Sequence, residues 1–197
     1  MTDEEKAQQA ARTRAKIMEG LARAERALFT RPAPKSARAQ MKFLRKREKG
    51  STKRLAQRLG VSRKAVQRYL SGASTKPHKR LQEALVQETE SEWQPQVRTQ
   101  ARQRATTSGG LVIKFRATLG FTANGSSDDT RVRDLSIAVS PSHAALILAT
   151  QEEDATDTDI HEAVAEAIAD AYFRQVGGGC ASLKVEFRDV EWLNIDF

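Results

Sequence analysis

Residues 51–72 read S-T-K-R-L-A-Q-R-L-G-V-S-R-K-A-V-Q-R-Y-L-S-G and decide how the first half of the chain is interpreted. A helix can begin after a capping hydroxyl from Ser51 or Thr52, and Gly60 can end it in a left-handed conformation. Ser62 can cap a second helix that runs to about the end of the stretch. The pattern predicts two short helices joined by a tight turn at the glycine.

The apolar residues of this stretch have the spacing that two packed helices require. Ala56 is small and lies four residues before Gly60, where the helices would cross. Val66 lies six residues after the glycine, where it can lock the second helix against the first. The side chains expected to be buried are Leu55, Leu59, Val61, Val66 and Leu70. Together these spacings predict a helix-turn-helix.

The polar residues of the second helix would project away from that buried side. Arginine and glutamine can make paired hydrogen bonds to guanine and adenine, and lysine and serine can contact phosphate. A charged face that is only solvated is the alternative interpretation. The residues expected to contact DNA in and around the motif are Thr52, Lys53, Ser62, Arg63, Lys64, Gln67, Arg68, Lys76 and Lys79.

The charge of the chain is divided unevenly along its 197 residues. Residues 1–107 hold 26 Lys/Arg and 10 Asp/Glu, a net charge of +16, whereas residues 108–197 hold 7 and 15, a net charge of −8. A basic half is expected to bind an anionic polymer. The acidic half would be repelled by DNA, so we expect it to meet a protein or to form a homodimer with a second copy of the chain.

Prolines, glycines and small polar residues divide the chain into expected domains. A charged helix within residues 1–30 has one narrow apolar stripe and is interpreted as an N-terminal extension, which a proline-rich segment ends. The helix-turn-helix domain is expected at residues 31–105, and residues 106–110, T-T-S-G-G, have the composition of a flexible linker. Further helices are expected at residues 36–49, 79–91 and 97–104.

Residues 111–197 form the expected second domain. Strands are indicated over residues 111–119 and 131–139, and the C-terminal residues indicate another strand or a bent pair of strands. Two helical segments lie between them, the first after Ser140 and the second from Asp157. The order is β-β-α-α-β. The expected fold class is therefore α+β, with an all-helical helix-turn-helix domain followed by a small sheet backed by helices.

Residues 120–133, G-F-T-A-N-G-S-S-D-D-T-R-V-R, connect the first two strands. Asn124-Gly125 strongly favours a hairpin turn. Four hydroxyl side chains surround that dipeptide: Thr122, Ser126, Ser127 and Thr130. As local sequence, the stretch predicts a hairpin loop that carries exposed hydroxyls.

The sequence offers little for catalysis by this chain alone. His78, His143 and His161 are far apart and have no ligand partner at a useful spacing, so no metal or cofactor of its own is expected. The single cysteine, Cys180, cannot form an internal disulfide, which fits a reducing cytoplasm. The acidic start is not a secretory signal, and no run approaches the roughly 20 apolar residues of a membrane span. We therefore expect a cytoplasmic protein with no membrane partner.

Five segments carry a family pattern in this order: F-T-R-P-A-P-K-S-A-R-A-Q-M (29–41), G-S-T-K-R-L-A-Q-R-L-G-V-S-R-K-A-V-Q-R-Y (50–69), W-Q-P-Q-V-R (93–98), A-T-T-S-G-G-L-V-I (105–113) and L-G-F-T-A (119–123). Together they resemble the telomere-protecting terminal protein family of linear actinobacterial chromosomes and plasmids. The resemblance begins near residue 27 and runs to the C-terminus, and the residues before it look like an extension that the family does not need.

The resemblance implies that the protein binds telomeric DNA in the nucleoid with a telomere-associated partner protein. It also implies that a hydroxyl of the chain accepts the first nucleotide from a DNA polymerase. The protein would thus prime end-filling synthesis, in protein-primed DNA replication, and stay covalently linked to the 5′ end. In that role the chain is not an enzyme but a protein primer, a substrate of the polymerase, which supplies the Mg²⁺ ions.

A priming hydroxyl has to reach into the active site of another enzyme, so it must lie on an exposed loop. The linker hydroxyls at residues 106–108 and the hairpin loop both qualify. Within the loop we favour Ser127, then Ser126, because both follow the expected tip, and then Thr122, which lies nearer a strand end. A turn without chemistry remains the alternative for this stretch.

A DNA-binding regulator is the alternative function for the whole chain. It would combine the same helix-turn-helix with an α+β domain that dimerises or senses a ligand, and it would read two half-sites about one helical turn apart. An enzyme that acts on DNA ends is disfavoured, because the sequence holds no set of metal ligands or activated nucleophile.

Overall fold

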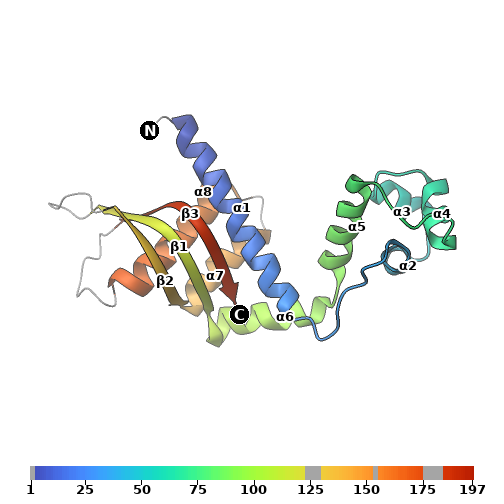
Figure 1. Ribbon diagram of the computed structural model, residues 1–197. Helices are drawn as coiled ribbons and strands as arrows, with labels where there is room; N and C mark the ends of the chain where they lie inside the picture. Colours follow the sequence, from blue (N-terminus) through green and yellow to red (C-terminus); the bar gives the residue numbers. More distant parts are fainter. Residues whose placement is uncertain (1–2, 123–129, 153–154, 175–183) are drawn as a thin grey trace. The chain divides into compact units, whose positions relative to one another are not determined.

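The computed structural model of the protein describes residues 3–122, 130–152, 155–174 and 184–197 (Figure 1). Helices dominate the N-terminal half and strands lie in the C-terminal half, so the expected α+β class is confirmed. The chain divides into two compact units: unit 1 is Met1–Leu28 with Arg98–Phe197, and unit 2 is Phe29–Val97. Along the chain, unit 2 is therefore an insertion within unit 1.

Unit 2 is built from short helices with polar caps. Its helices are α2 (Ala37–Arg47), α3 (Thr52–Arg58), α4 (Arg63–Ser71) and α5 (Lys79–Glu92). The residue before each helix accepts a hydrogen bond from the backbone N–H three residues later; these caps are Ser36, Ser51, Ser62 and His78. Because a helix N-terminus leaves its first N–H groups unpaired, such caps fix where each helix begins.

The turn between α3 and α4 has the geometry that its glycine predicts. Gly60 has a φ of +63°, a left-handed conformation that glycine adopts at little cost. The Val61 N–H donates to the Ala56 carbonyl at 3.0 Å, which closes the end of α3. The buried side chains of α2 to α5 then meet in one small core: Ala37, Met41, Leu44, Leu55, Ala56, Leu59, Val66, Tyr69, Leu81 and Leu85.

The described strands of unit 1 form a three-stranded antiparallel sheet in the order β2-β1-β3. They are β1 (Leu111–Thr122), β2 (Arg131–Val139) and β3 (Lys184–Asp196). Alternate residues of the central strand are buried, and Ile113 pairs with Ile137 on one side and Ile195 on the other. Side chains alternate between the two faces of a strand, so these residues define the core face of the sheet.

Helices cover that core face. Helices α7 (Pro141–Glu152) and α8 (Asp157–Ile168) lie behind the sheet in Figure 1, and α8 continues into the π-helical turn η2 (Ala169–Arg174). Thr156 and Asp159 form a capping box that fixes the start of α8. Ile147, Val164 and Ile168 bury their side chains against the core residues of the sheet. In this part of the chain the described elements follow the order β-β-α-α-β.

The N-terminal helix is part of unit 1, which differs from the expected extension at residues 1–30. Helix α1 (Asp3–Ala27) places Ile17, Leu21 and Ala24 in the core of unit 1. A Cβ atom on Gly20 would lie only 2.8 Å from Leu193 Cδ2, so this glycine lets α1 pack closely on β3. The apolar stripe that the sequence displays is thus the buried face of a structural helix.

Residues 106–110 form ordered structure in place of the expected linker. Helix α6 (Pro95–Arg104) continues into the π-helical turn η1 (Ala105–Gly109), in which the Thr106 and Thr107 hydroxyls donate to the Gln103 carbonyl at 3.1 and 2.8 Å. Gly110 has a φ of +68°, and a Cβ there would lie 2.0 Å from the Val139 carbonyl oxygen. Glycine is therefore required at this position for close packing against β2. Residues 106–110 have the composition of a flexible linker, although their glycine serves packing.

No helix in the described ranges is both long enough and apolar enough to cross a membrane.

Candidate nucleic-acid interface

Four of the predicted DNA contacts meet at the turn between α3 and α4. Arg63 Nε donates a hydrogen bond to Thr52 Oγ1 at 3.1 Å, which joins the start of α4 to the start of α3. Lys53, Ser62 and Arg63 line the same open hollow. The Ser62 hydroxyl also accepts from the Ala65 N–H at 3.1 Å, so it caps α4 while remaining exposed. The turn therefore presents two hydroxyls and two cations together.

The exposed side of α4 carries the remaining predicted residues of the motif. Arg63 and Gln67 are four residues apart and share one row of the helix surface, while Lys64 and Arg68 form the adjacent row. All four are exposed, and Val66 lies on the opposite, buried side. Neither α3 nor α4 contains an aspartate or a glutamate. This side of the helix pair is thus basic and free of acidic residues.

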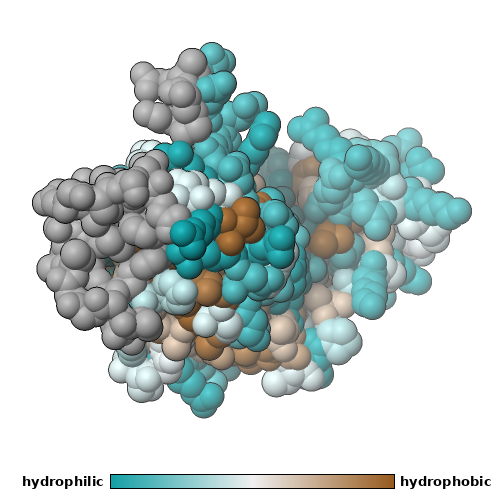
Figure 2. Space-filling model, turned by 60° about the vertical axis from the view of Figure 1, so that its left-hand side comes forward, coloured by the Kyte–Doolittle hydropathy of each residue, from teal (hydrophilic) through white to brown (hydrophobic). Residues whose placement is uncertain are grey.

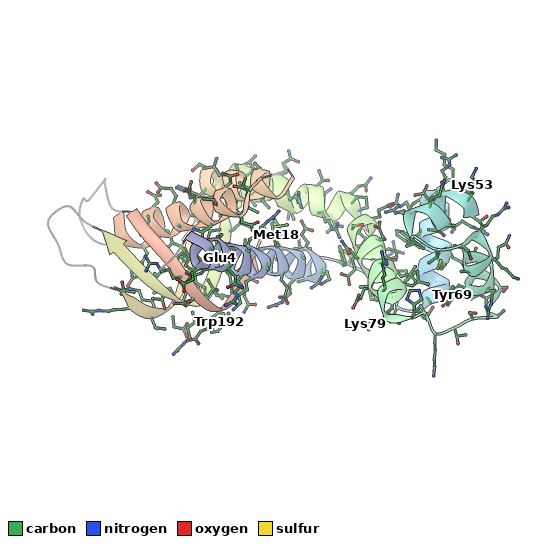
Figure 3. The ribbon with its side chains drawn as sticks, turned by 90° about the horizontal axis from the view of Figure 1, so that it is seen from above. Glu4, Met18, Lys53, Tyr69, Lys79 and Trp192 are labelled. Atoms are coloured by element: carbon green, nitrogen blue, oxygen red, sulfur yellow. The ribbon has the colours of Figure 1, made fainter. Side chains whose placement is uncertain are left out.

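Lys76 and Lys79 lie beyond the end of α4, apart from the turn. The Tyr69 hydroxyl donates to the Lys76 carbonyl at 3.3 Å, so the segment before α5 is held against α4. Lys79 begins α5, and in Figure 3 it lies on a different side of unit 2 from Lys53. The structure therefore brings together the residues of the turn and α4 but does not gather all nine predicted residues into one patch.

Unit 2 concentrates its acidic charge around one arginine. Residues 29–97 hold 17 Lys/Arg and five Asp/Glu, a net charge of +12. Arg58 donates to Glu88 Oε2 at 2.8 Å and to Glu48 Oε1 at 3.1 Å, and it also pairs with Glu92. Burial lowers the pKa of Arg58, but the hydrogen bonds to these carboxylates outweigh burial and raise it above its ordinary value. Three of the five acids are therefore neutralised away from α4.

The packing of unit 2 keeps the helix that carries two of those acids apart from α4. Helix α4 packs on α2 and α3, whereas α5, which carries Glu88 and Glu92, packs on α2. Hydrophilic residues cover most of the helical unit on the side seen in Figure 2. Because like charges would repel DNA phosphates, separating acids from the α4 surface favours an interaction with nucleic acid there.

Trp93 is held in place by protein contacts. Its ring meets the Phe43 ring edge to face, with centroids 5.1 Å apart, and its Nε1–H donates to the Arg31 carbonyl at 2.9 Å. Arg47 lies over the other ring of this pair, 5.3 Å from the Phe43 centroid. These contacts favour an anchoring role for the tryptophan over stacking on a base.

Two arginines of the basic segment at residues 97–104 are paired with a carboxylate inside unit 1. Glu25, only 5% exposed, pairs with Arg102 Nη2 at 2.6 Å and with Arg98 Nε at 3.4 Å. Both arginines come from α6 and are committed to a carboxylate of α1. Counted along the sequence, these two arginines belong to the basic half of the chain. In the structure their charge is paired with Glu25 inside unit 1.

The structure describes both sides of the predicted hydroxyl loop but not its tip. Thr122 is the last residue of β1, and its backbone pairs with Lys184 of β3. Thr130 is exposed just before β2 begins. Ser126 and Ser127 lie outside the described residues, so their role stays a prediction.

One polar cluster that the sequence did not suggest lies at the start of α7. Ser140 Oγ is 2.9 Å from His143 Nδ1, and Asp170 Oδ2 is 3.8 Å from that same nitrogen. In a serine–histidine–carboxylate relay the two partners contact different nitrogens of the imidazole, so this geometry does not match a relay. The Ser-x-x-His spacing instead places the histidine next to a helix cap.

Within the described part of the chain, no group of three His, Cys, Asp or Glu side chains could hold a metal ion. Comparisons with protein-family models, with curated proteins and with solved structures gave no significant match. We therefore infer the class of protein from the residues themselves.

Proposed function

We propose that this protein is a terminal protein of a linear replicon, which binds telomeric DNA in the nucleoid through a helix-turn-helix formed by α3 and α4. The main support for DNA binding is the surface of α4, which is basic and has no acidic residues, in a unit with a net charge of +12. A telomere-associated protein and a DNA polymerase are the further partners. The resemblance of the five quoted segments to terminal proteins supports the telomeric role.

In the proposed complex α4 enters the major groove as the recognition helix. Arg63 and Gln67 share a row and would read base edges, because guanidinium and amide groups can pair with guanine and adenine. Lys64 and Arg68, in the adjacent row, would contact phosphate or a flanking base. The residues of the turn (Thr52, Lys53 and Ser62), together with Lys76 and Lys79, would contact phosphates on either side.

Alanine substitution of the two α4 arginines tests this mode. In Arg63→Ala/Arg68→Ala the affinity for duplex telomeric DNA should fall by more than about tenfold at moderate salt, since a good base contact contributes about 1–3 kcal/mol. Arg12→Ala/Arg23→Ala removes two exposed arginines from α1 and serves as the control for lost charge. Equal affinities for both variants and the wild type in a fluorescence-anisotropy titration would place DNA on another surface.

Priming by a hydroxyl is the second part of the proposal, and it is supported by the resemblance of residues 105–113 and 119–123 to terminal proteins. The hydroxyl oxygen would attack the α-phosphorus of a deoxynucleotide, forming a phosphodiester and releasing pyrophosphate, within the polymerase and with its metal ions. Ser127 is the favoured acceptor, followed by Ser126 and Thr122. The loop has only to extend the hydroxyl into the active site of the polymerase, because the polymerase activates the oxygen.

Incubation with polymerase, telomeric template and labelled deoxynucleotide tests priming. We expect a labelled adduct that survives denaturation and is lost in Ser127→Ala, while DNA affinity stays unchanged. Ser136→Ala, at an exposed serine of β2, is the matched control. Retention of label in Ser127→Ala moves the site to Ser126, Thr122 or residues 106–108, and absence of any adduct from the wild type removes the priming proposal.

A helix-turn-helix regulator is the second candidate, and it is favoured by a sheet face of unit 1 that no described helix covers. Such a protein would dimerise and protect two symmetric half-sites about one helical turn apart. A footprint with that symmetry, together with no covalent adduct, would select the regulator over the terminal protein.

A further inference from the structure

The sheet of unit 1 has a second face that none of the described helices covers. Alternate residues of the strands lie there in four rows, read across β2, β1 and β3. The rows are Val132, Thr118 and Arg188; Asp134, Arg116 and Trp192; Ser136, Lys114 and Asn194; and Ala138, Val112 and Asp196. Helices α7 and α8 lie on the opposite side of the sheet in both Figure 1 and Figure 3. We call these twelve residues the open face.

The open face exposes two large apolar side chains. Trp192 is 38% exposed and Val132 is 55% exposed. Figure 3 labels Trp192 on β3, on the side away from α7 and α8. Tryptophan buries a large area on binding and is enriched at the energetically dominant positions of protein interfaces. A partner that covers this face would therefore gain most from covering Trp192.

The charges of the open face are nearly balanced, with three cations and two carboxylates among its twelve residues. The central strand contributes the cations Lys114 and Arg116, and the outer strands contribute Asp134, Asp196 and the cation Arg188. Within the sheet, Lys114 Nζ lies 2.9 Å from Asp196 Oδ2, and Arg116 Nη1 lies 3.9 Å from Asp134 Oδ2. Arg116 Nε also pairs with Glu191 of β3 at 2.9 Å. Lys114 and Arg116 thus have carboxylate partners, and the net charge of the open face is only +1, which gives little attraction for a polyanion.

Around Lys114 and Arg116 the open face has a basic centre with carboxylates on the outer strands beside it, and this pattern is complementary to a second copy of itself. When two sheets stack face to face with crossing strands, the central residues of one sheet lie over the outer strands of the other. Lys114 and Arg116 of one copy would then approach the outer-strand acids of the other, and the two copies of Trp192 would be buried together. From these features we propose that the open face is a homodimer interface.

The size of the open face sets the strength of this dimer. Three strands about 4.8 Å apart and four repeats of about 6.8 Å cover only several hundred Å². A standard interface buries about 800 Å² on each partner, so the association is weak and reversible. We expect a dissociation constant of roughly 10–1,000 µM, in the absence of DNA. The same dimer is expected whether or not the chain is a terminal protein.

Sedimentation equilibrium of the full chain over about 5 µM to 1 mM tests the dimer, since this range brackets the expected constant. The wild type should move from monomer to dimer as concentration rises. Trp192→Glu and Val132→Glu should each weaken association by at least about tenfold, because each places a charge in the apolar part of the interface. Leu146→Glu adds the same charge at an equally exposed residue of α7 and should leave association unchanged.

Fluorescence gives a second readout that does not depend on those variants. In Trp93→Phe, Trp192 is the one remaining tryptophan of the chain, and its emission should shift to the blue as concentration rises and the ring becomes buried. A single monomeric mass over the whole range overturns the proposal. So does association that Leu146→Glu abolishes while Trp192→Glu does not. Quenching of Trp192 by single-stranded oligonucleotide, without a concentration-dependent shift, would assign the face to nucleic acid instead.

Discussion

The two units bury opposite kinds of charge, and the contrast explains how one chain separates its proposed DNA-binding surface from the rest of its fold. Unit 2 surrounds one arginine, Arg58, with three glutamates. Unit 1 surrounds one glutamate, Glu25, with two arginines. In each unit the central residue has the same sign as the net charge of the unit, and the residues paired with it have the opposite sign.

This arrangement changes how the charge of the chain should be divided. The split at residue 107 gives +16 and −8, but α1 and most of α6 belong to unit 1. Divided by units, residues 29–97 carry +12, while residues 1–28 and 98–197 hold 16 Lys/Arg against 20 Asp/Glu, a net charge of −4. The contrast between a basic and an acidic part persists, and the basic part is smaller and more sharply defined.

The largest expected effect comes from removing the glutamate of unit 1. Glu25→Ala leaves Arg98 and Arg102 without the carboxylate that neutralises them in a mostly buried site, so unit 1 should lose about 3 kcal/mol of stability. Urea unfolding followed by Trp192 fluorescence in a Trp93→Phe background measures this loss. Glu19→Ala removes an exposed carboxylate of the same helix and should change stability by less than about 0.5 kcal/mol. Equal losses in both variants would contradict a special role for Glu25.

The counterpart in unit 2 should be somewhat smaller. Arg58→Met keeps the bulk of the side chain but leaves three carboxylates together, and because this cluster is partly exposed we expect a loss of about 2 kcal/mol. Trp93 fluorescence in a Trp192→Phe background reports on unit 2, to which Trp93 belongs. Arg54→Met, at an exposed position of α3, is the control and should be nearly neutral. A stabilised Arg58→Met would mean that burying the ions costs more than their pairing returns.

DNA affinity should distinguish the arginines of the two units. Arg68→Ala should weaken duplex binding about tenfold, whereas Arg102→Gln should change it by less than about twofold, because Arg102 is paired with Glu25. Both variants lose one positive charge, so a general electrostatic effect would be the same in each. Anisotropy titrations at two salt concentrations measure the difference. Similar losses in both variants would show that α6 contributes to the DNA-binding surface.

The smallest effect is expected at an exposed carboxylate, in contrast with Glu25. Hydrogen bonds from the Thr156 hydroxyl and backbone N–H lower the pKa of Asp159. A carboxylate with a lowered folded-state pKa stabilises the fold above its unfolded pKa, and that contribution is lost as pH falls through the folded value. The melting temperature of Asp159→Asn should therefore lie slightly below that of wild type near pH 6 and converge with it near pH 3. A constant difference across this range would exclude the charged cap.

Local sequence signals located most of the secondary structure. Ser51, Gly60 and Ser62 mark helix ends by interactions within a few residues, and such interactions do not depend on the rest of the fold. Period-two alternation likewise located β2. For the candidate interface, the helical spacing of the apolar residues identified Arg63, Lys64, Gln67 and Arg68 as exposed before any tertiary contact was known. Lys79 was grouped with them by charge alone, and charge does not specify position.

The sequence by itself determined the α+β class, the helix ends and the exposed basic side of α4, because each depends on caps, turns and periodicity between near neighbours. Only the tertiary structure decided that α1 belongs to unit 1, that residues 105–109 form an ordered turn, and that Arg98 and Arg102 serve Glu25. Those outcomes depend on contacts between residues far apart in the chain, such as Gly20 with Leu193 and Gly110 with Val139. An apolar stripe or a basic segment in a sequence shows that its side chains need packing or ion-pair partners. Only the fold determines which residues those partners are.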